Sequence, residues 1–269
     1  VLIDRDVDAV ALGRLSAKTK FRMAGQICVS PTRFLVHREV YDTFVGEFAA
    51  GAEAIRDGDG FAEGVEMGPL AGPKRVAAME ALVSDALARG ARLAAGGKRI
   101  GNEGSFYAPT VLTDVPLDAE VMSVEPFGPL AACVAVDNRI GDRLANALPV
   151  GLAAYGFTNS LPLAERIAAE VQAGSVAINV FTSPGPDAPF GGYKESGIGR
   201  EGGEHSLDAY MISKLYEMFG PCLKSTENAA AEKRGRGILI LGASTLDNRL
   251  VGDQRGDFIL AEPKFAQSG

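Results

Sequence analysis

The chain has 269 residues, of which 46% are hydrophobic and 23% charged, and its formal net charge is −7. This composition is that of a folded globular protein and excludes a disordered or fibrous chain. Because nucleic acid and anionic membrane surfaces attract clusters of Lys and Arg, the acidic balance predicts no nucleic-acid partner and no membrane partner, and it favours a small-molecule ligand.

The chain carries no predicted transmembrane helix or secretory signal. The uncharged stretches 144–164 and 171–186 are interrupted by Pro, Gly and Asn, whereas a spanning helix needs roughly 20 predominantly apolar residues. The charged residues Asp4, Arg5 and Asp6 leave no room for the apolar core of a signal peptide.

Cysteine usage favours a reducing, cytoplasmic location. Cys28, Cys133 and Cys222 are too few and too scattered for a disulfide scaffold. The sequence opens on the apolar run Val-Leu-Ile at 1–3 with no Met before it. We therefore expect it to be part of a longer protein.

Short apolar runs alternate with amphipathic stretches from Arg33 onward, which is typical of βα units. The pattern predicts an α/β fold with a largely parallel sheet. The predicted strands are 1–3, 34–37, 91–95, 106–112, 130–136, 154–157, 175–180 and 238–241, and the predicted helices are 38–55, 74–89, 142–148 and 163–172. The stretch 184–203, rich in Gly and Pro, is expected to form turns and loop.

The character of the sequence changes after about residue 220. Residues 224–237 are polar and charged, like a linker. We predict one domain over 1–220, followed by a linker and C-terminal extension of unknown role over 221–269. No internal repeat supports a solenoid.

Cys28 is the strongest candidate for a nucleophile, because a catalytic thiol must be reachable and held in a turn or at the end of an element. Gly25 permits close backbone approach before it, and Pro31 ends the segment after it. A buried structural thiol is the alternative that the residues leave open, and Cys133, inside an apolar run, is the example of it.

Other site chemistries find no support in the sequence. His37 and His205 lie near no Cys or Ser in a recognisable motif, so neither a Cys-His dyad nor a metal site is predicted. The glycine-rich run 191–200 lacks the order of a phosphate-binding loop.

The ordered motifs of the chain resemble the aldehyde dehydrogenase superfamily. They are Gly-Gln-Ile-Cys at 25–28, Met-Gly-Pro-Leu at 67–70, Glu-Pro-Phe-Gly-Pro at 125–129, Gly-Leu-Ala-Ala-Tyr at 151–155 with Phe-Thr at 157–158, and Pro-Phe-Gly-Gly-Tyr-Lys-Glu-Ser-Gly at 189–197. The resemblance covers roughly residues 1–219. It implies a three-layer catalytic domain, truncated at its N-terminal side, with an open and mainly parallel sheet.

The resemblance implies oxidation of an aldehyde to a carboxylic acid with NAD or NADP. Cys28 would add to the aldehyde, and a thiohemiacetal and then a thioester would form on it, while its backbone N–H would help to hold the oxyanion. Glu125 matches the family residue that binds the nicotinamide ribose, and Phe127 the ring beside the nicotinamide. Further residues correspond to the substrate pocket: Ile27, Val29, Thr182, Ser183, Pro184 and Phe190.

The sequence also departs from the family. Met23 replaces a frequent Asn and Val124 a frequent Glu. The segment that carries the general base and the Rossmann-like cofactor domain would precede Val1, so the chain alone is expected to be incomplete as an enzyme. A catalytically silent fragment and a CoA-acylating semialdehyde dehydrogenase are the alternatives.

The aldehyde itself is left open by the sequence. No Arg or Lys lies within 180–188, but Arg22 and Arg33 lie near the nucleophile and keep carboxylated semialdehydes possible. We expect a homo-oligomer in the full-length form.

Overall fold

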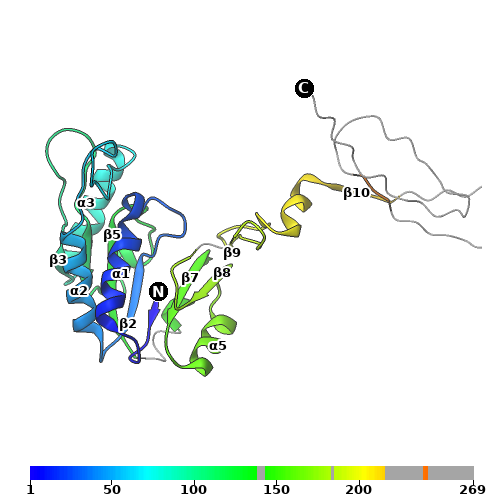
Figure 1. Cartoon of the computed structure of the whole chain (residues 1–269), viewed down its shortest axis with the longest axis horizontal. Helices are drawn as coiled ribbons and strands as arrows, with labels where there is room; N and C mark the ends of the chain where they lie inside the picture. The colour runs from blue at the N-terminus through cyan, green and yellow to red at the C-terminus, as the bar shows by residue number, and fades with distance from the viewer. Residues whose placement is uncertain (138–142, 183–184, 216–238, 242–269) are drawn as a thin grey trace, which may run out of the picture. The chain divides into compact units, whose positions relative to one another are not determined.

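The computed structural model describes residues 1–137, 143–182, 185–215 and 239–241. The chain divides into two units, Val1–Ser206 and Leu207–Gly269. The first unit contains a seven-stranded sheet in the order β3-β4-β5-β2-β1-β7-β8 (Figure 1). Its strands are β1 (Leu2–Ile3), β2 (Arg33–His37), β3 (Arg92–Ala95), β4 (Thr110–Thr113), β5 (Leu130–Val136), β7 (Ala153–Phe157) and β8 (Ser175–Ile178).

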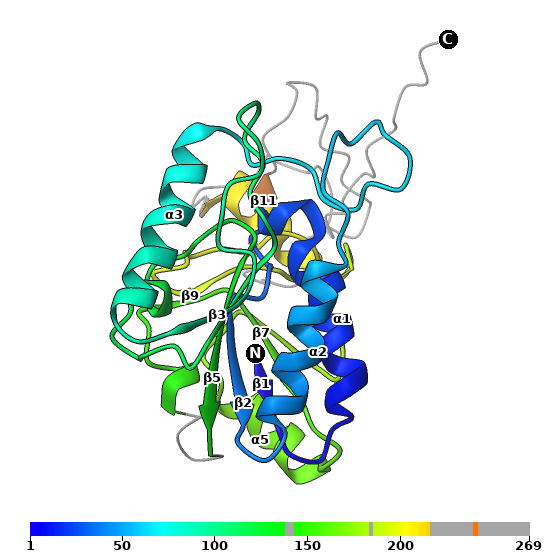
Figure 2. The ribbon, with the colours of Figure 1, turned by 90° about the vertical axis from the view of Figure 1, so that its left-hand side faces the viewer.

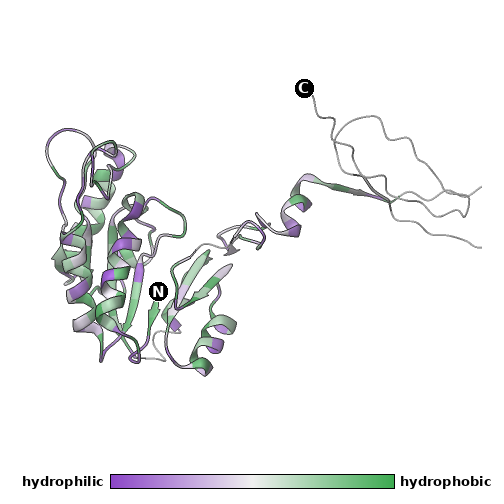
Figure 3. Ribbon diagram, viewed as in Figure 1, coloured by the Kyte–Doolittle hydropathy of each residue, from purple (hydrophilic) through white to green (hydrophobic). Residues whose placement is uncertain are grey.

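The sheet is mainly parallel, as the sequence predicts. All neighbouring strands run parallel except the edge pair β3 and β4, which is antiparallel. Parallel strands need crossover connections, and the helices supply them. Figure 3 shows that the strands in the middle of the sheet carry mainly hydrophobic residues, as strands covered on both faces do.

Helices cover both faces of the sheet, which confirms the three-layer α/β prediction. Helices α1 (Ala9–Phe21) and α2 (Tyr41–Glu53) lie side by side along one face, and α3 (Pro73–Ala88) lies on the other side of the strands (Figure 2). Helix α5 (Leu161–Glu170) covers the face opposite to α1 and α2. Its Ile167 lies against Gly156 on β7, which is in register with Leu35. Leu35 points to the other face from Phe34, the residue that packs on α2.

An aromatic cluster forms the centre of the layer between α1, α2 and β2. Phe34 of β2 packs against Phe44 and Phe48 of α2, with ring centroids 6.0 and 4.8 Å away, and Phe21 of α1 lies 6.0 Å from Phe48. All four side chains are fully buried. Each ring removes a large apolar area from water, so this cluster stabilises the side of the sheet on which α1 carries the nucleophile segment.

Helix α1 is absent from the predicted elements. Its buried positions include Gly13, Ser16 and Lys20, so its inner face lacks the apolar stripe by which an amphipathic helix is recognised. Gly13 is required there, because a Cβ would lie 2.7 Å from the Phe44 carbonyl oxygen of α2. The signal that the prediction overlooked is the N-cap, Asp8, whose side chain accepts hydrogen bonds from two backbone N–H groups.

Two predicted boundaries are wrong for backbone reasons. The strand predicted over 106–112 begins at Thr110, after Pro109, which has no N–H for a strand ladder. The helix predicted from residue 38 begins at Tyr41, because the Arg38 N–H still pairs with the Val136 carbonyl beyond the end of β2.

The stretch predicted as turns and loop contains one short strand. Strand β9 (Tyr193–Lys194) pairs antiparallel with β6 (Val150–Gly151). The predicted short helix over 142–148 is seen in part, with residues 143–145 helical.

Among the described residues of the second unit, β10 (Ile212–Lys214) runs antiparallel to β11 (Leu239–Leu241). Strand β11 lies within the run predicted as a strand. The predicted domain boundary at residue 220 lies outside the described residues.

We expect Phe48→Ala to lower the free energy of unfolding by about 3–5 kcal/mol, because it leaves a cavity among fully buried rings. Urea unfolding followed by circular dichroism measures the change. Phe61→Ala is the matched control, since Phe61 is 101% exposed and its removal should change stability by no more than about 0.5 kcal/mol. Equal losses for the two variants would contradict the packing described here.

Candidate functional site

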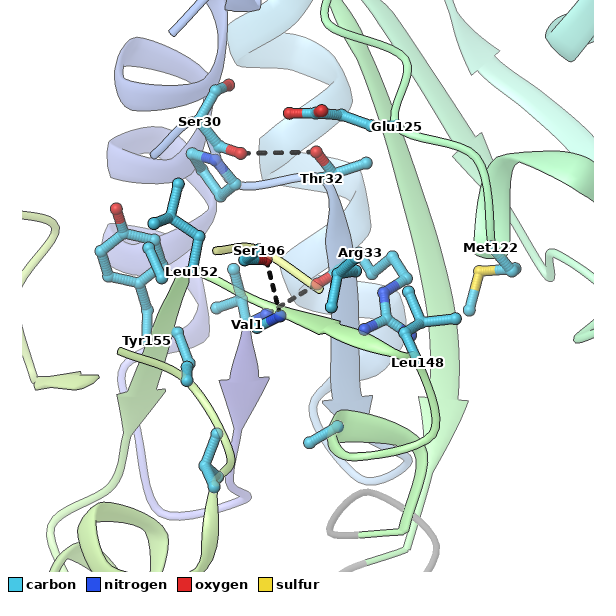
Figure 4. Close-up of a pocket in the computed structure, with 18 of the residues that line it drawn as sticks. Val1, Ser30, Thr32, Arg33, Met122, Glu125, Leu148, Leu152, Tyr155 and Ser196 are labelled. Atoms are coloured by element: carbon cyan, nitrogen blue, oxygen red, sulfur yellow. Dashed lines mark hydrogen bonds between the residues drawn. The ribbon is translucent and has the colours of Figure 1, made fainter. Parts of the chain in front are cut away.

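A cavity of about 600 Å³ lies where β1, β2 and β7 begin. Cys28, Glu125 and Phe127 all line it, so residues almost a hundred positions apart in the sequence share one site. Figure 4 shows Ser30, Thr32 and Glu125 at the top of this cavity, with Val1, Arg33 and Ser196 below them.

Cys28 lies on a tight turn between the short helix η1 (Arg22–Gly25) and β2. The Ser30 N–H donates to the Ile27 carbonyl oxygen at 2.9 Å and closes this turn. The Cys28 side chain is exposed. The thiol is therefore reachable and backed by a fixed backbone, as a nucleophile requires.

Gly25 allows the turn to lie directly against the loop that carries Glu125 and Phe127. Its φ is +67°, and a Cβ at this position would lie 2.2 Å from the Gly128 carbonyl oxygen. Met23 and Ala24 before it also have positive φ, 52° and 53°. Three consecutive left-handed residues are costly outside glycine, and such strain collects at functional sites.

Gln26 connects the nucleophile turn to the Met-Gly-Pro-Leu motif. Its side-chain amide donates to the Pro69 carbonyl at 3.3 Å, and its Oε1 accepts from the Ala71 N–H at 2.8 Å. Two motifs that are separate in the sequence therefore lie against each other.

Tyr155 connects the turn to β7 on the other side. Its hydroxyl donates to the Val29 carbonyl oxygen at 2.7 Å, and its ring packs edge-on against Phe181 at 5.0 Å. Burial, with the nearby Cys28 thiol adding to the effect, raises the pKa of Tyr155 to about 12, so the hydroxyl stays a donor. Tyr155 belongs to the Gly-Leu-Ala-Ala-Tyr motif, which by itself predicted no role for the hydroxyl.

Three cations lie close to the nucleophile segment. Lys20 is fully buried and donates to the Ser30 Oγ at 3.2 Å. Arg33 lines the cavity, donates to the Leu144 carbonyl at 3.3 Å, and has its pKa lowered by burial. Arg22, on η1, is exposed and forms no ion pair with any residue that the structure describes.

Four of the predicted pocket residues lie in the described part of the chain, and none of the four lines this cavity. Ile27 and Val29 flank Cys28 but do not line it, Thr182 is exposed, and the Phe190 backbone pairs with Glu201. Ser183 and Pro184 lie outside the described residues. Their assignment to the substrate pocket stays a prediction.

The loop after β9 reaches the cavity, although the sequence analysis named none of its residues as site residues. Glu195 and Ser196 line the cavity, and the Ser196 Oγ accepts from the Gly151 N–H at 2.9 Å. The Gly-Gly-Tyr-Lys-Glu-Ser-Gly motif was the signal that could have placed them.

The residues present fit one end of a dinucleotide. The exposed Glu125 carboxylate can accept hydrogen bonds from ribose hydroxyls, and the 40% exposed Phe127 ring offers a flat apolar surface at the same cavity. In the part of the chain that the structure describes, no group of three His, Cys, Asp or Glu side chains could hold a metal ion. No helix among these residues is long and apolar enough to cross a membrane.

Comparison with known proteins gives one family. A family profile described as "Aldehyde dehydrogenase family" matches residues 1–216. The 4-(hydroxymethyl)benzenesulfonate dehydrogenase TsaD1 of Comamonas testosteroni is 42% identical over 80% of this chain and 45% of its own length. The mitochondrial succinate-semialdehyde dehydrogenase of Mus musculus is 40% identical over 80% of this chain and 41% of its own.

Solved structures agree with the sequence comparison. The crystal structure of succinate-semialdehyde dehydrogenase from Burkholderia pseudomallei superposes with a TM-score of 0.75 at 39% identity, covering 78% of this chain and 44% of that one. The chain therefore spans less than half the length of the relatives that it matches.

Gly25→Ala should disrupt the site for two reasons. The new Cβ would collide with the Gly128 carbonyl, and the alanine backbone would have to adopt a positive φ. We expect a loss of about 1–3 kcal/mol in unfolding free energy, together with a changed rate of Cys28 alkylation. Gly46→Ala is the control, since nothing lies within 4 Å of its Cβ position on α2, and it should be neutral or stabilising. If Gly25→Ala had the same unfolding free energy and the same Cys28 alkylation rate as the unchanged chain, the close contact would be disproved.

The two described cysteines should react very differently with iodoacetamide near neutral pH. Cys28 is exposed, whereas Cys133 is buried and burial raises the pKa of its thiol well above the usual range. We expect rapid alkylation of Cys28 and at least about a hundredfold slower alkylation of Cys133, measured by peptide mass mapping. Comparable rates in the folded protein would contradict this assignment.

Proposed function

Because the chain belongs to the aldehyde dehydrogenase family, we propose that its cavity binds an aldehyde and that Cys28 forms the covalent bond through which the aldehyde is oxidised to a carboxylic acid. The observation that carries the proposal is the position of Cys28. Its exposed thiol lies on a turn held by Gly25, Gln26 and Tyr155 and opens on the cavity that Glu125 and Phe127 line.

The first step is addition of the Cys28 thiolate to the aldehyde carbon. A carbon–sulfur bond forms, the carbonyl double bond opens, and its electron pair moves to the oxygen. The Cys28 backbone N–H donates to no acceptor in the described part of the chain, so it is free to stabilise that oxyanion. The product is a thiohemiacetal on Cys28.

Glu125 and Phe127 are the residues that would hold the nicotinamide end of NAD or NADP. When bound, the oxidised nicotinamide accepts a hydride, which is what converting the thiohemiacetal carbon to the oxidation level of a thioester requires. Water then adds to the thioester carbon, the carbon–sulfur bond breaks, and the carboxylic acid leaves with the Cys28 thiol restored.

We further propose that the aldehyde carries an anionic group. The names of the two relatives described above contain a sulfonate and a succinate semialdehyde, both of which are anionic. In this chain Arg22 is exposed six positions before Cys28, and its guanidinium is available to pair with such a group. A charge-assisted hydrogen bond of this kind contributes about 1.5–3 kcal/mol.

The experiment is protection of Cys28 from alkylation by aldehydes, measured by peptide mass mapping. Succinic semialdehyde is compared with butanal, and para-formylbenzenesulfonate with para-tolualdehyde. We expect each anionic aldehyde to protect at a concentration about tenfold lower than its neutral partner, which corresponds to about 1.4 kcal/mol. Arg22→Leu should remove the difference within each pair.

Lys18→Leu is the control, because Lys18 is an exposed cation on the neighbouring helix α1. In this variant each aldehyde should protect Cys28 at the same concentration as in the unchanged chain. Absence of protection by all four aldehydes would contradict the role of Cys28, whereas equal protection by anionic and neutral aldehydes would contradict only the substrate class.

A further inference from the structure

Lys20 is a buried cation that the proposed mechanism does not use. Its side chain is 0% exposed, and it lies at the last turn of α1, one residue before the helix ends. Burial lowers its pKa to about 7, with the nearby Glu125 carboxylate partly opposing the shift. An apolar side chain in this place would avoid the cost of desolvation, so stability alone gives no reason for an amine.

The amine lies where the two loops of the site meet. It donates to the Ser30 Oγ at 3.2 Å, and Ser30 closes the turn that carries Cys28. A Cβ built on Gly25 would lie 3.3 Å from the Lys20 Nζ and 2.2 Å from the Gly128 carbonyl oxygen. The turn, the end of α1 and the loop with Glu125 therefore converge on this one group.

Among the charged groups around Lys20, Glu125 is the one that acts on its pKa. Arg22 on η1 and the carboxylates of α2, namely Asp42, Glu47 and Glu53, have no resolved effect on the Lys20 pKa, whereas Glu125 does. Glu47 is engaged by Arg14, with Nε to Oε2 at 2.7 Å. The positive charge of Lys20 therefore interacts mainly with Ser30 of the Cys28 turn and with Glu125 of the neighbouring loop.

We propose that Lys20 is a positioning residue that holds the turn bearing Cys28 against the loop bearing Glu125 and Phe127, and that the reactivity of Cys28 follows the protonation state of this amine. With the proton, the ammonium hydrogen-bonds Ser30 and attracts Glu125. Without it, the attraction to Glu125 is lost and the two loops are less firmly aligned.

The catalytic meaning of this inference rests on the proposed role of Cys28, but its test does not. The rate of Cys28 alkylation by iodoacetamide is measured on the full chain against pH, without aldehyde or cofactor. A failure of aldehyde protection would refute the proposed function and leave this measurement unaffected, and the reverse also holds.

Besides the thiolate formation on which every alkylation by iodoacetamide depends, the profile of the unchanged chain should show a second ionisation with a midpoint near the Lys20 pKa of about 7. Lys20→Met should lose the second ionisation. Lys20→Arg, which stays charged throughout, should also lose the second ionisation. At low pH its Cys28 should be alkylated at the same rate as that of the unchanged chain. Lys18→Met, two residues earlier on the same helix and exposed, should keep both ionisations.

Slow alkylation of Cys133 and an unchanged circular dichroism spectrum verify that each variant is folded. If Lys20→Met does not fold, Ser30→Ala decides the matter, because it keeps the amine and removes only its link to the turn. Ser30→Ala should weaken the second ionisation. A Lys20→Met profile, or in its absence a Ser30→Ala profile, that superposes on that of the unchanged chain would overturn the proposal.

Discussion

The whole site depends on the contact between Gly25 and the Gly128 carbonyl oxygen. A Cβ at Gly25 would lie 2.2 Å from that oxygen, so the turn and the loop touch backbone to backbone. Only glycine permits this distance together with a positive φ. The contact fixes Cys28 on one side relative to Glu125 and Phe127 on the other, and the hydrogen bonds of Gln26 and Tyr155 hold the turn in this place from two further directions.

The polar groups behind this contact are expensive to bury, and each has a defined partner. Tyr155 donates to the Val29 carbonyl, and Lys20 donates to the Ser30 hydroxyl. Because burial lowers the Lys20 pKa to about 7, the unfolded chain binds more protons between that pH and the ordinary lysine value. Stability therefore rises with pH across this window, and the charged amine costs stability below it. The site accepts this cost where the two loops join.

The sequence predicted the parts of the site that are written as motifs, and it missed those that are made by tertiary contact. The alternation of apolar runs and helices was sufficient for the parallel sheet, and the family resemblance brought Cys28 together with Glu125 and Phe127. Tyr155 and Ser196 act through backbone groups far away in the chain, and Lys20 acts through the Ser30 hydroxyl, and no local pattern encodes these partners. Helix α1 was missed because Gly13, Ser16 and Lys20 interrupt its apolar stripe. Gly13 allows the close approach of the Phe44 carbonyl, and Lys20 hydrogen-bonds Ser30, so tertiary contacts rather than helix propensity account for these two residues.

The two described cysteines show why position in the sheet decides the chemistry. In open α/β sheets ligands usually bind beyond the carboxyl ends of the strands. Here the cavity lies at the amino ends of β1, β2 and β7, because the nucleophile turn runs directly into β2 and the Glu125 loop leads into β5. Cys133 pairs with Phe34 in the middle of the same two strands, where desolvation keeps its thiol neutral. Cys28 lies only five residues before the start of β2, and there the backbone can leave the ladder, turn, and present a thiol to the cavity.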